Sequence, residues 1–479
     1  MRDEHLSQND FGALGVPSPL VERLAATGIT SAFPIQVATL PDTLAGRDVL
    51  GRGKTGSGKT LAFALPLVAR LAQASRQPAG GRGRGSGRTR PGHPRGLVLA
   101  PTRELATQIA AVFEPLAGAY DLTVTTIFGG ISQNRQVTAL RAGVDIVIAC
   151  PGRLEDLMNQ GHANLGDVSI TVLDEADHMA DLGFLPVVTR IMNRTPSGGQ
   201  RMLFSATLDN GVDALVRRYL KDELRHSVDS ANSPVSAMTH RVFEVPDVTT
   251  KRDVVQALAS GTGRRILFMR TKHQAKKLAR QLTAAGIPSV DLHGNLSQNQ
   301  RDRNLKAFTD GTSSVLVATD VAARGVHVDD VELVVHVDPP AEHKSYLHRS
   351  GRTARAGSEG SVLTLVLPEQ RRDTHQLMRK AKISVKPESV TATSGAVTAL
   401  VGEVAAYVEP PAPAQQQQRA NPGRGRSGGR GRGGAPHGGS GSDAGGSSGP
   451  GRRRRSRGHG RSGASRGRAG GSRTRSASA

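Results

Sequence analysis

The chain has 479 residues, a formal net charge of +22 at pH 7 and a single cysteine, Cys150, so it cannot form an intramolecular disulfide. Its first residues, "MRDEHLSQND", lack the apolar core of a secretory signal, and no apolar run is long enough to span a bilayer. These features predict a cytoplasmic protein with no membrane contact and with two or three domains.

The positive charge is concentrated in two low-complexity segments. Residues 410–479 contain 15 Arg and one Asp, and residues 73–96 contain six Arg and no acid, which together account for +20 of the +22. Segments of this composition cannot bury a core, so we expect a disordered tail and a disordered surface loop. The tail has no aromatic residue after Tyr407. We therefore expect electrostatic, sequence-independent contact with nucleic acid, with a merely solubilising tail as the alternative.

Between these segments, short apolar runs end in polar or glycine-containing clusters and are followed by helix-like segments. In the first half the runs are "RDVLGRGKTGSGKT", "GLVLAPTREL", "LTVTTIFGG", "VDIVIACPGR", "ITVLDEAD" and "RMLFSAT". In the second half they are "RRILFMRT", "PSVDLHGN", "SSVLVATD", "VELVVHVDPP" and "GSVLTLVLPE". This alternation predicts two α/β domains, each a parallel sheet with helices on both faces.

The domain boundaries follow from where this alternation breaks. The stretch around 227–238 is rich in Ser, Asn and Pro and has no periodicity, so it predicts a linker. The expected order is an N-terminal segment (1–38), a first domain (39–228) with the insert at 73–96, a linker (229–238), a second domain (239–390), a C-terminal extension (391–409) and the tail (410–479).

The segment Gly53–Thr60, "GKTGSGKT", follows a short apolar stretch and precedes a helix-like segment. This is the pattern of a phosphate-binding loop, in which small residues let backbone N–H groups surround phosphates at a helix N-terminus. Lys59 would contact the β- and γ-phosphates, and the Thr60 hydroxyl would bind Mg²⁺. A glycine-rich turn is the less favoured alternative.

Three carboxylates stand where the apolar run 170–173 ends. Asp174 could be a helix N-cap with Asp177 three residues later, or it could serve a metal ion. The phosphate-binding loop favours the metal, because Mg²⁺ there needs a carboxylate from another strand. Asp174 is then the metal-side carboxylate, and Glu175 orients or deprotonates the attacking water.

The segment 346–357, "YLHRSGRTARAG", places Arg349, Arg352 and Arg355 three residues apart. On a helix these side chains would lie along one side, and one of them could stabilise the transition state of phosphoryl transfer. A solvated basic face is the alternative.

The motif order from Phe11 to about residue 370 resembles that of the DEAD-box ATP-dependent RNA helicases of superfamily 2, of the bacterial type with an Arg/Gly-rich tail. The resemblance implies two RecA-like domains. It also implies that Gln36, in "GITSAFPIQ", reads the adenine edge and that Phe11 packs on the adenine ring. The remaining nucleotide contacts that it implies are Gly53, Lys54, Thr55, Gly56, Ser57, Gly58, Lys59, Thr60 and Asp174.

The resemblance also implies an RNA path and the link to it. The expected RNA-backbone contacts are Pro101, Thr102, Arg103, Gly129, Gly130, Pro151, Gly152, Arg153, Arg301 and Thr319. Ser205 and Thr207, with Asp177, would couple the ATP and RNA sites. Arg352 and Arg355 would be the γ-phosphate arginines and act in catalysis with Glu175 and Lys59.

Some positions depart from the family pattern. Gly53 replaces a usual Ala, Phe33 a usual Thr, and Cys150 a usual Thr. His327 stands where the family has an Asp that contacts the ATP ribose, so either His327 or Asp329 substitutes or the contact is absent. We assign the other histidines no role.

These patterns predict an ATP- and Mg²⁺-dependent RNA helicase that grips single-stranded RNA and short duplexes by the backbone. Ribosome assembly, RNA turnover and cold response are the candidate processes, with ribonucleoprotein or RNA-degradation partners. The rival hypotheses are a non-catalytic clamp and a DNA-directed helicase.

Overall fold

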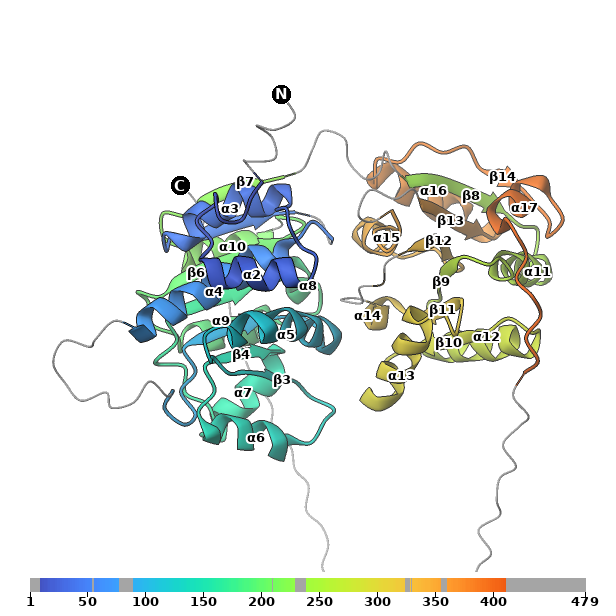
Figure 1. Ribbon diagram of the computed structural model, residues 1–479. Coiled ribbons are helices and arrows are strands. Elements are labelled where there is room, and N and C mark those ends of the chain that lie inside the picture. The colour runs from blue at the N-terminus through green and yellow to red at the C-terminus, as the bar shows by residue number, and fades with distance from the viewer. Residues whose placement is uncertain are drawn as a thin grey trace, which may run out of the picture. The chain divides into compact units, whose positions relative to one another are not determined.

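The computed structural model describes residues 9–53, 56–76, 89–208, 210–228, 238–323, 328, 330–354 and 360–410. Two seven-stranded sheets form the cores of two domains (Figure 1). No described helix is long and apolar enough to cross a membrane.

The first domain contains strands β1 to β7 and helices α2 to α10. Its strands are β1 (Val49–Arg52), β2 (Gly96–Leu99), β3 (Val124–Ile127), β4 (Ile146–Ala149), β5 (Ile170–Leu173), β6 (Gln200–Ser205) and β7 (Leu224–Ser227). Its helices are α2 (Ser18–Ala26), α3 (Pro34–Leu44), α4 (Lys59–Arg76), α5 (Arg103–Gly118), α6 (Gln133–Ala142), α7 (Pro151–Asn159), α8 (Ala176–Asp181), α9 (Leu185–Met192) and α10 (Asn210–Tyr219).

The second domain contains strands β8 to β14, helices α11 to α17 and one 3₁₀ helix. Its strands are β8 (Met238–Glu244), β9 (Arg264–Phe268), β10 (Ser289–Leu292), β11 (Val315–Ala318), β12 (Val331–His336), β13 (Gly360–Val366) and β14 (Glu388–Ser389). Its helices are α11 (Val248–Ala259), α12 (Lys272–Ala284), α13 (Gln298–Thr309), α14 (Asp320–Ala323), α15 (His343–Ser350), η1 (Pro368–Gln370), α16 (Arg371–Lys380) and α17 (Gly395–Val401).

The two sheets share one topology. Their strand orders are β3-β4-β2-β5-β6-β1-β7 and β10-β11-β9-β12-β13-β8-β14, so with strands counted within each domain both read 3-4-2-5-6-1-7. All pairs between named strands are parallel. Parallel neighbours need crossover connections, which the helices provide. The predicted fold class is confirmed.

Successive residues of the inner strands point to opposite faces, and both faces are buried under helices. In the first domain, Val98 packs with helices α2 to α5, whereas Leu97 and Leu99 pack with helices α6 to α10. In the second domain, Leu267 packs with α11, α12 and α17, whereas Ile266 packs with α13 to α16. This two-sided burial explains why the strands read as continuous apolar runs.

The insert differs from its predicted bounds. Helix α4 continues to Arg76, and residues 89–95 are held by the buried carboxylate of Asp145. That carboxylate accepts hydrogen bonds from Thr89 Oγ1 and, at 2.6 Å, from Arg95 Nη2. The predicted segment 73–96 was therefore too long at both ends, and 77–88 lie outside the described residues.

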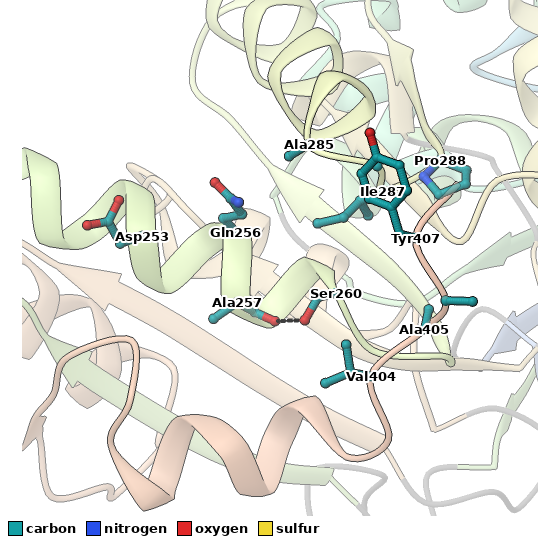
Figure 2. Close-up of a pocket in the computed structure, with 12 residues that line it drawn as sticks. Asp253, Gln256, Ala257, Ser260, Ala285, Ile287, Pro288, Val404, Ala405 and Tyr407 are labelled. Atoms are coloured by element: carbon teal, nitrogen blue, oxygen red, sulfur yellow. Dashed lines mark hydrogen bonds between the residues drawn. The ribbon is translucent and has the colours of Figure 1, made fainter. Parts of the chain in front are cut away.

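The predicted C-terminal extension belongs to the second domain. Val397 and Val401 of α17 lie in the core that covers one face of the second sheet. Beyond α17 the chain runs back across the domain: Ala405 N donates to Ser260 O at 2.7 Å, and Val408 N donates to Gly286 O at 3.0 Å. Figure 2 shows Tyr407 beside Pro288, on the wall of a hollow of about 460 Å³ that this segment forms with the end of α11. We call residues 402–410 the C-terminal strap.

Candidate nucleotide and RNA site

The carboxyl edge of the first sheet collects nearly all predicted site residues of this domain. The phosphate-binding loop follows β1, Asp174 follows β5 and Ser205 ends β6, and these three strands are neighbours. The predicted RNA contacts follow β2, β3 and β4, which are neighbours in the other half of the sheet. Ligands of parallel sheets bind at this edge. The topology therefore places a nucleotide half beside an RNA half on one edge.

The phosphate-binding loop has the backbone that its glycines allow. Gly56 and Gly58 have φ angles of 86° and 88°, a left-handed conformation that side chains disfavour. Gly53 is packed closely as well, because an added Cβ there would lie 2.8 Å from Ser57 Oγ. Lys59 and Thr60 open helix α4, and Lys59 Nζ donates to Gly53 O at 2.7 Å. Lys54 and Thr55 lie outside the described residues.

Gln36 ties the N-terminal segment to this loop. Its Oε1 accepts from Phe33 N at 2.9 Å, and its Nε2 donates to Gly58 O at 2.8 Å. Phe11 differs from expectation: its ring is 1% exposed within the core, so it presents no face for adenine to pack on. The exposed aromatic ring at the loop is Phe33, which is 50% exposed and would touch a Cβ added at Gly58.

The acidic cluster at the end of β5 is buried. Asp174 is 3% and Glu175 is 4% exposed. Burial raises the pKa of Asp174 to about 7, although the nearby charge of Lys59 opposes this shift. Asp174 is not a helix N-cap, because Glu175 occupies that position before α8, with φ 49° and ψ 53°. A left-handed backbone at a non-glycine residue is strained, which is common at functional sites.

The donor set at this edge fits a hard divalent cation. The Thr60 hydroxyl and the Asp174 carboxylate are oxygen ligands, which Mg²⁺ prefers. A buried carboxylate whose pKa is raised is also a group that a cation would stabilise in its charged form. These two residues could therefore hold Mg²⁺ together with nucleotide phosphates.

His178, which received no role from the sequence, contacts Glu175 directly. Its Nδ1 lies 2.6 Å from Glu175 Oε2, and its Nε2 lies 3.0 Å from Nδ1 of His348. Burial raises the pKa of Glu175, but His178, Lys59 and Arg352 together hold it well below its usual range. Glu175 and His178 are three residues apart at the start of α8, and this spacing is the sequence signal from which their contact could have been predicted.

Asp177, Ser205 and Thr207, the predicted coupling residues, form one hydrogen-bond network. Asp177 Oδ2 accepts from both Thr207 N and Thr207 Oγ1 at 2.9 Å. Ser205 Oγ donates to Thr207 O at 2.7 Å and accepts from Asp177 N at 3.3 Å. The end of β6 is therefore fastened to the acidic cluster.

The RNA half of the edge brings helix starts and arginines together. Thr102 caps helix α5 by accepting from Leu105 N at 3.3 Å, and Pro101 precedes it. Pro151 and Gly152 open α7. Helix N-termini bind anions such as phosphate.

Gly129 and Gly130 lie against Arg103 and Arg153. A Cβ added at Gly130 would meet the Arg103 guanidinium, and one added at Gly129 would lie 3.7 Å from Arg103 Nη2 and 4.0 Å from Arg153 Nη2. Buried Arg153 Nη1 has no hydrogen-bond partner within the described part of the chain. Cys150, just before α7, is mostly buried, which raises its thiol pKa to about 12 and argues against reactivity.

Arg301 differs from its expected role. The residue is 7% exposed, and its guanidinium donates to Glu104 Oε1 at 2.6 Å and to Ala322 O at 3.1 Å. In this structure it forms a buried ion pair rather than an exposed phosphate contact. Thr319 follows β11 and is partly exposed at the carboxyl edge of the second sheet.

The predicted arginine row of one helix is wrong. Helix α15 ends at Ser350, so Arg352 lies in the following turn, whereas Arg349 lies in the helix. Arg349 holds Asp320 with two hydrogen bonds of 2.5 and 2.8 Å, which makes it a structural residue. Arg352 remains the candidate for the nucleotide. The other candidates of this region, Arg355, His327 and Asp329, lie outside the described residues.

Comparison with known proteins is consistent with this site. The family described as DEAD/DEAH box helicase matches residues 33–215, and the helicase conserved C-terminal domain matches residues 250–357. Fold and site thus define a P-loop protein of two RecA-like domains. The chain belongs to the DEAD-box ATP-dependent RNA helicases.

Several relatives show how far the similarity extends. A chloroplastic DEAD-box ATP-dependent RNA helicase 3B of Zea mays is 43% identical over 76% of this chain and 48% of its own length. This chain thus spans about half the length of that relative. ATP-dependent RNA helicase RhlB of Sodalis glossinidius is 39% identical over 77% of this chain and 88% of its own length. The solved structure of S. cerevisiae Dbp5 bound to RNA and ADP BeF3 has a TM-score of 0.69 at 26% identity, over 82% of this chain and 100% of that one.

Proposed function

We propose that this protein is an RNA-stimulated ATPase that locally unwinds short RNA duplexes. The observation that carries the proposal is the shared carboxyl edge of the first sheet, where the phosphate-binding loop and acidic cluster adjoin the helix starts and arginines of the RNA half. The network of Asp177, Ser205 and Thr207 joins the acidic cluster to β6, so a change at the nucleotide can be passed along this edge.

Each residue of the nucleotide half has a distinct task. Lys59 and the loop N–H groups hold the β- and γ-phosphates. Thr60 and Asp174 would hold Mg²⁺, which when bound neutralises charge on the transferring phosphoryl group. Glu175 takes the proton of the attacking water at Oε1, since Oε2 is engaged by His178. Arg352 stabilises the charge that develops on the γ-phosphate, with Arg355 as its proposed partner.

The RNA half contacts phosphates rather than bases. Helix N-termini, glycine N–H groups and arginines carry no base-specific pattern, so binding should be independent of RNA sequence. Holding a bent strand that cannot stay paired would open a short duplex, and hydrolysis would release the strand.

RNA-stimulated ATP hydrolysis is the decisive measurement. We expect single-stranded RNA to stimulate turnover, DNA to stimulate it much less, and Lys59→Ala to abolish it by weakening ATP binding. RNA binding that needs nucleotide, without turnover, would instead identify a non-catalytic clamp. Equal stimulation by DNA would overturn the RNA assignment.

We further propose that the protein remodels RNA in the cytoplasm during ribosome assembly, RNA turnover or growth in the cold, with ribonucleoprotein or RNA-degradation partners. The support is the backbone-directed site, which suits many RNAs. Crosslinking the protein to cellular RNA and sequencing the bound fragments tests this: enrichment of ribosomal precursors or decaying messengers supports it, and a single unrelated RNA class contradicts it.

A further inference from the structure

The second domain has another groove, beside the last residues of β8 and β13, Glu244 and Val366. It has a volume of about 380 Å³ and is lined by residues of α16, strands β8 and β13 and the loop that leads to β14. Its floor is aliphatic: Val242, Val366, Met378 and Ile383 are each less than 9% exposed. We call it the α16 groove. Its volume is within the range of about 300–1,000 Å³ that is typical of ligand sites.

A buried hydroxyl in this groove lacks a partner. Thr374 lines the groove and is 4% exposed, and its Oγ1 has no hydrogen-bond partner within the described part of the chain. Buried polar groups are nearly always hydrogen-bonded, because leaving them unpaired is costly. The hydroxyl is therefore positioned to bond a group that enters the groove.

The rim of the groove is basic. His375, Arg379 and Lys382 line it and are exposed, and none forms an ion pair with another described residue. Arg371, one further turn back, is already paired with Glu244 at 2.8 Å. Residues at i, i+4 and i+8 of a helix share a face, so the side chains of Arg371, His375 and Arg379 follow the length of the groove. An aliphatic floor below a cationic rim complements a ligand that carries both aliphatic groups and carboxylates.

We propose that the α16 groove binds a partner protein through a short peptide segment whose aliphatic side chains are flanked by Asp or Glu. The lining favours a peptide over RNA, because the floor of the groove is aliphatic and no Phe, Tyr or Trp on which bases could stack lines it. The aliphatic side chains fill the floor, a backbone or side-chain polar group pairs with Thr374 Oγ1, and the carboxylates meet Arg379 and Lys382.

The test uses full-length protein and a fluorescein-labelled peptide built from the repeat Glu-Leu-Leu-Glu, with binding followed by anisotropy. Arg379→Glu with Lys382→Glu should weaken binding at least tenfold. The matched control is Arg372→Glu with Lys380→Glu, which makes the same charge change on exposed α16 residues that do not line the groove. The control should bind within twofold of the unchanged protein. Both variants keep the basic tail, so any attraction of the tail for the acidic peptide contributes equally to the two measured affinities.

Two further arms separate the groove from general charge attraction. A peptide with Ser in place of Leu should bind the two double variants with similar affinity. Thr374→Val should weaken the Glu-Leu peptide several-fold without lowering the melting temperature, since Val fills the same space without an unpaired hydroxyl. Equal losses in both double variants would overturn the proposal. So would a labelled single-stranded RNA that loses affinity in the groove variant alone, because the groove would then be an RNA contact.

Discussion

Glu175 combines burial, a left-handed backbone and a carboxyl group with a lowered pKa. Glu175→Gln removes the proposed base, while the Gln side chain has nearly the same size and shape as Glu. We expect ATP and RNA binding to persist while turnover falls by about 10²–10⁴, the usual contribution of a general base. Steady-state ATPase and equilibrium ATP binding, measured together, check this.

The control for Glu175→Gln is Lys59→Ala, whose loss should appear in ATP affinity instead. The Glu175→Gln protein should also form a long-lived complex with RNA and ATP. A near-normal steady-state ATPase rate in Glu175→Gln would contradict the assignment of Glu175 as the base.

His178 is expected to act as a positioning residue for Glu175. His178→Ala removes a hydrogen bond to a charged group, which is worth about 1.5–3 kcal/mol, so kcat should fall about 10- to 100-fold. KM for ATP should change little, because the ring nitrogens of His178 contact Glu175 and His348 rather than a described residue of the phosphate-binding loop. His178→Asn retains an N–H donor and should recover part of kcat. Equal losses in the Ala and Asn variants would contradict a positioning role.

Residue spacing predicted the placement of side chains where a motif is local, and it failed where contacts with distant parts of the chain determine that placement. Lys59, Asp174 and Glu175 stand within short motifs that follow strands, so their meeting at one edge could be inferred. The burial of Phe11 and the ion pair of Arg301 depend on distant parts of the chain, which no spacing reveals.

The second sheet contains one fully buried histidine, His336, and one partly buried histidine, His240. Burial lowers the pKa of His240, on β8, to about 4, and it lowers the pKa of His336, on β12, well below its usual range. His240 Nδ1 lies 2.8 Å from Tyr346 Oη, and Thr364 Oγ1 lies 3.3 Å from His336 Nδ1. Both rings are therefore neutral in the fold.

This arrangement makes the second domain sensitive to acid. In the unfolded chain these histidines take up protons near pH 6.5, whereas in the folded domain they do so only near pH 4 or below. Their contribution to the free energy of unfolding is therefore fully present above pH 6.5 and is lost as the pH falls toward 4. We expect the melting temperature to drop by about 4 °C or more between pH 7.5 and 5. His240→Gln should reduce this drop, whereas the exposed His375→Gln should not. A pH-independent melting temperature in the unchanged protein would refute the argument.

At the scale of elements, the apolar inner strands and the edge strands β3 and β10 were predicted, whereas β7, β8 and β14 were not. Strands β2, β4 and β5 are buried throughout and read as apolar runs. Strand β7, "LRHS", alternates between partly buried and exposed residues, and β14 has two exposed residues. Such edges carry charge and little apolar content, so their pairing comes from the sheet. Helix α15 was expected to run through the arginines, but it ends at Ser350.

The whole molecule has a nearly neutral folded part and a basic tail, which predicts two modes of RNA binding. Truncation after Val408 removes the 15 Arg of the tail but keeps the hydrogen bond of Val408 N to Gly286 O, so the C-terminal strap stays in place. RNA affinity should fall most at low salt, and the log–log salt slope should flatten by about 0.7 for each lost phosphate contact. The kcat at saturating RNA should stay within about twofold.

A full-length variant with every tail Arg replaced by Gln is the control for length. It should behave like the truncated protein if charge, rather than chain length, holds the RNA. An unchanged salt slope in both would show that the tail does not touch RNA, and a collapsed kcat would show that it does more than tether.

The position of β1 inside its sheet has a consequence for synthesis of the chain. Strand β1, which leads into the phosphate-binding loop, pairs only with β6 and β7, whose residues are made about 150 or more positions later. At about 5–20 residues per second, roughly 8–35 s pass between the synthesis of the loop and the synthesis of these two strands. A ribosome-stalled chain whose residues up to 199 have emerged from the ribosome should not be retained on ATP-agarose. A chain that has emerged beyond residue 228 should be retained. Retention by the shorter chain would show that the loop forms before its sheet.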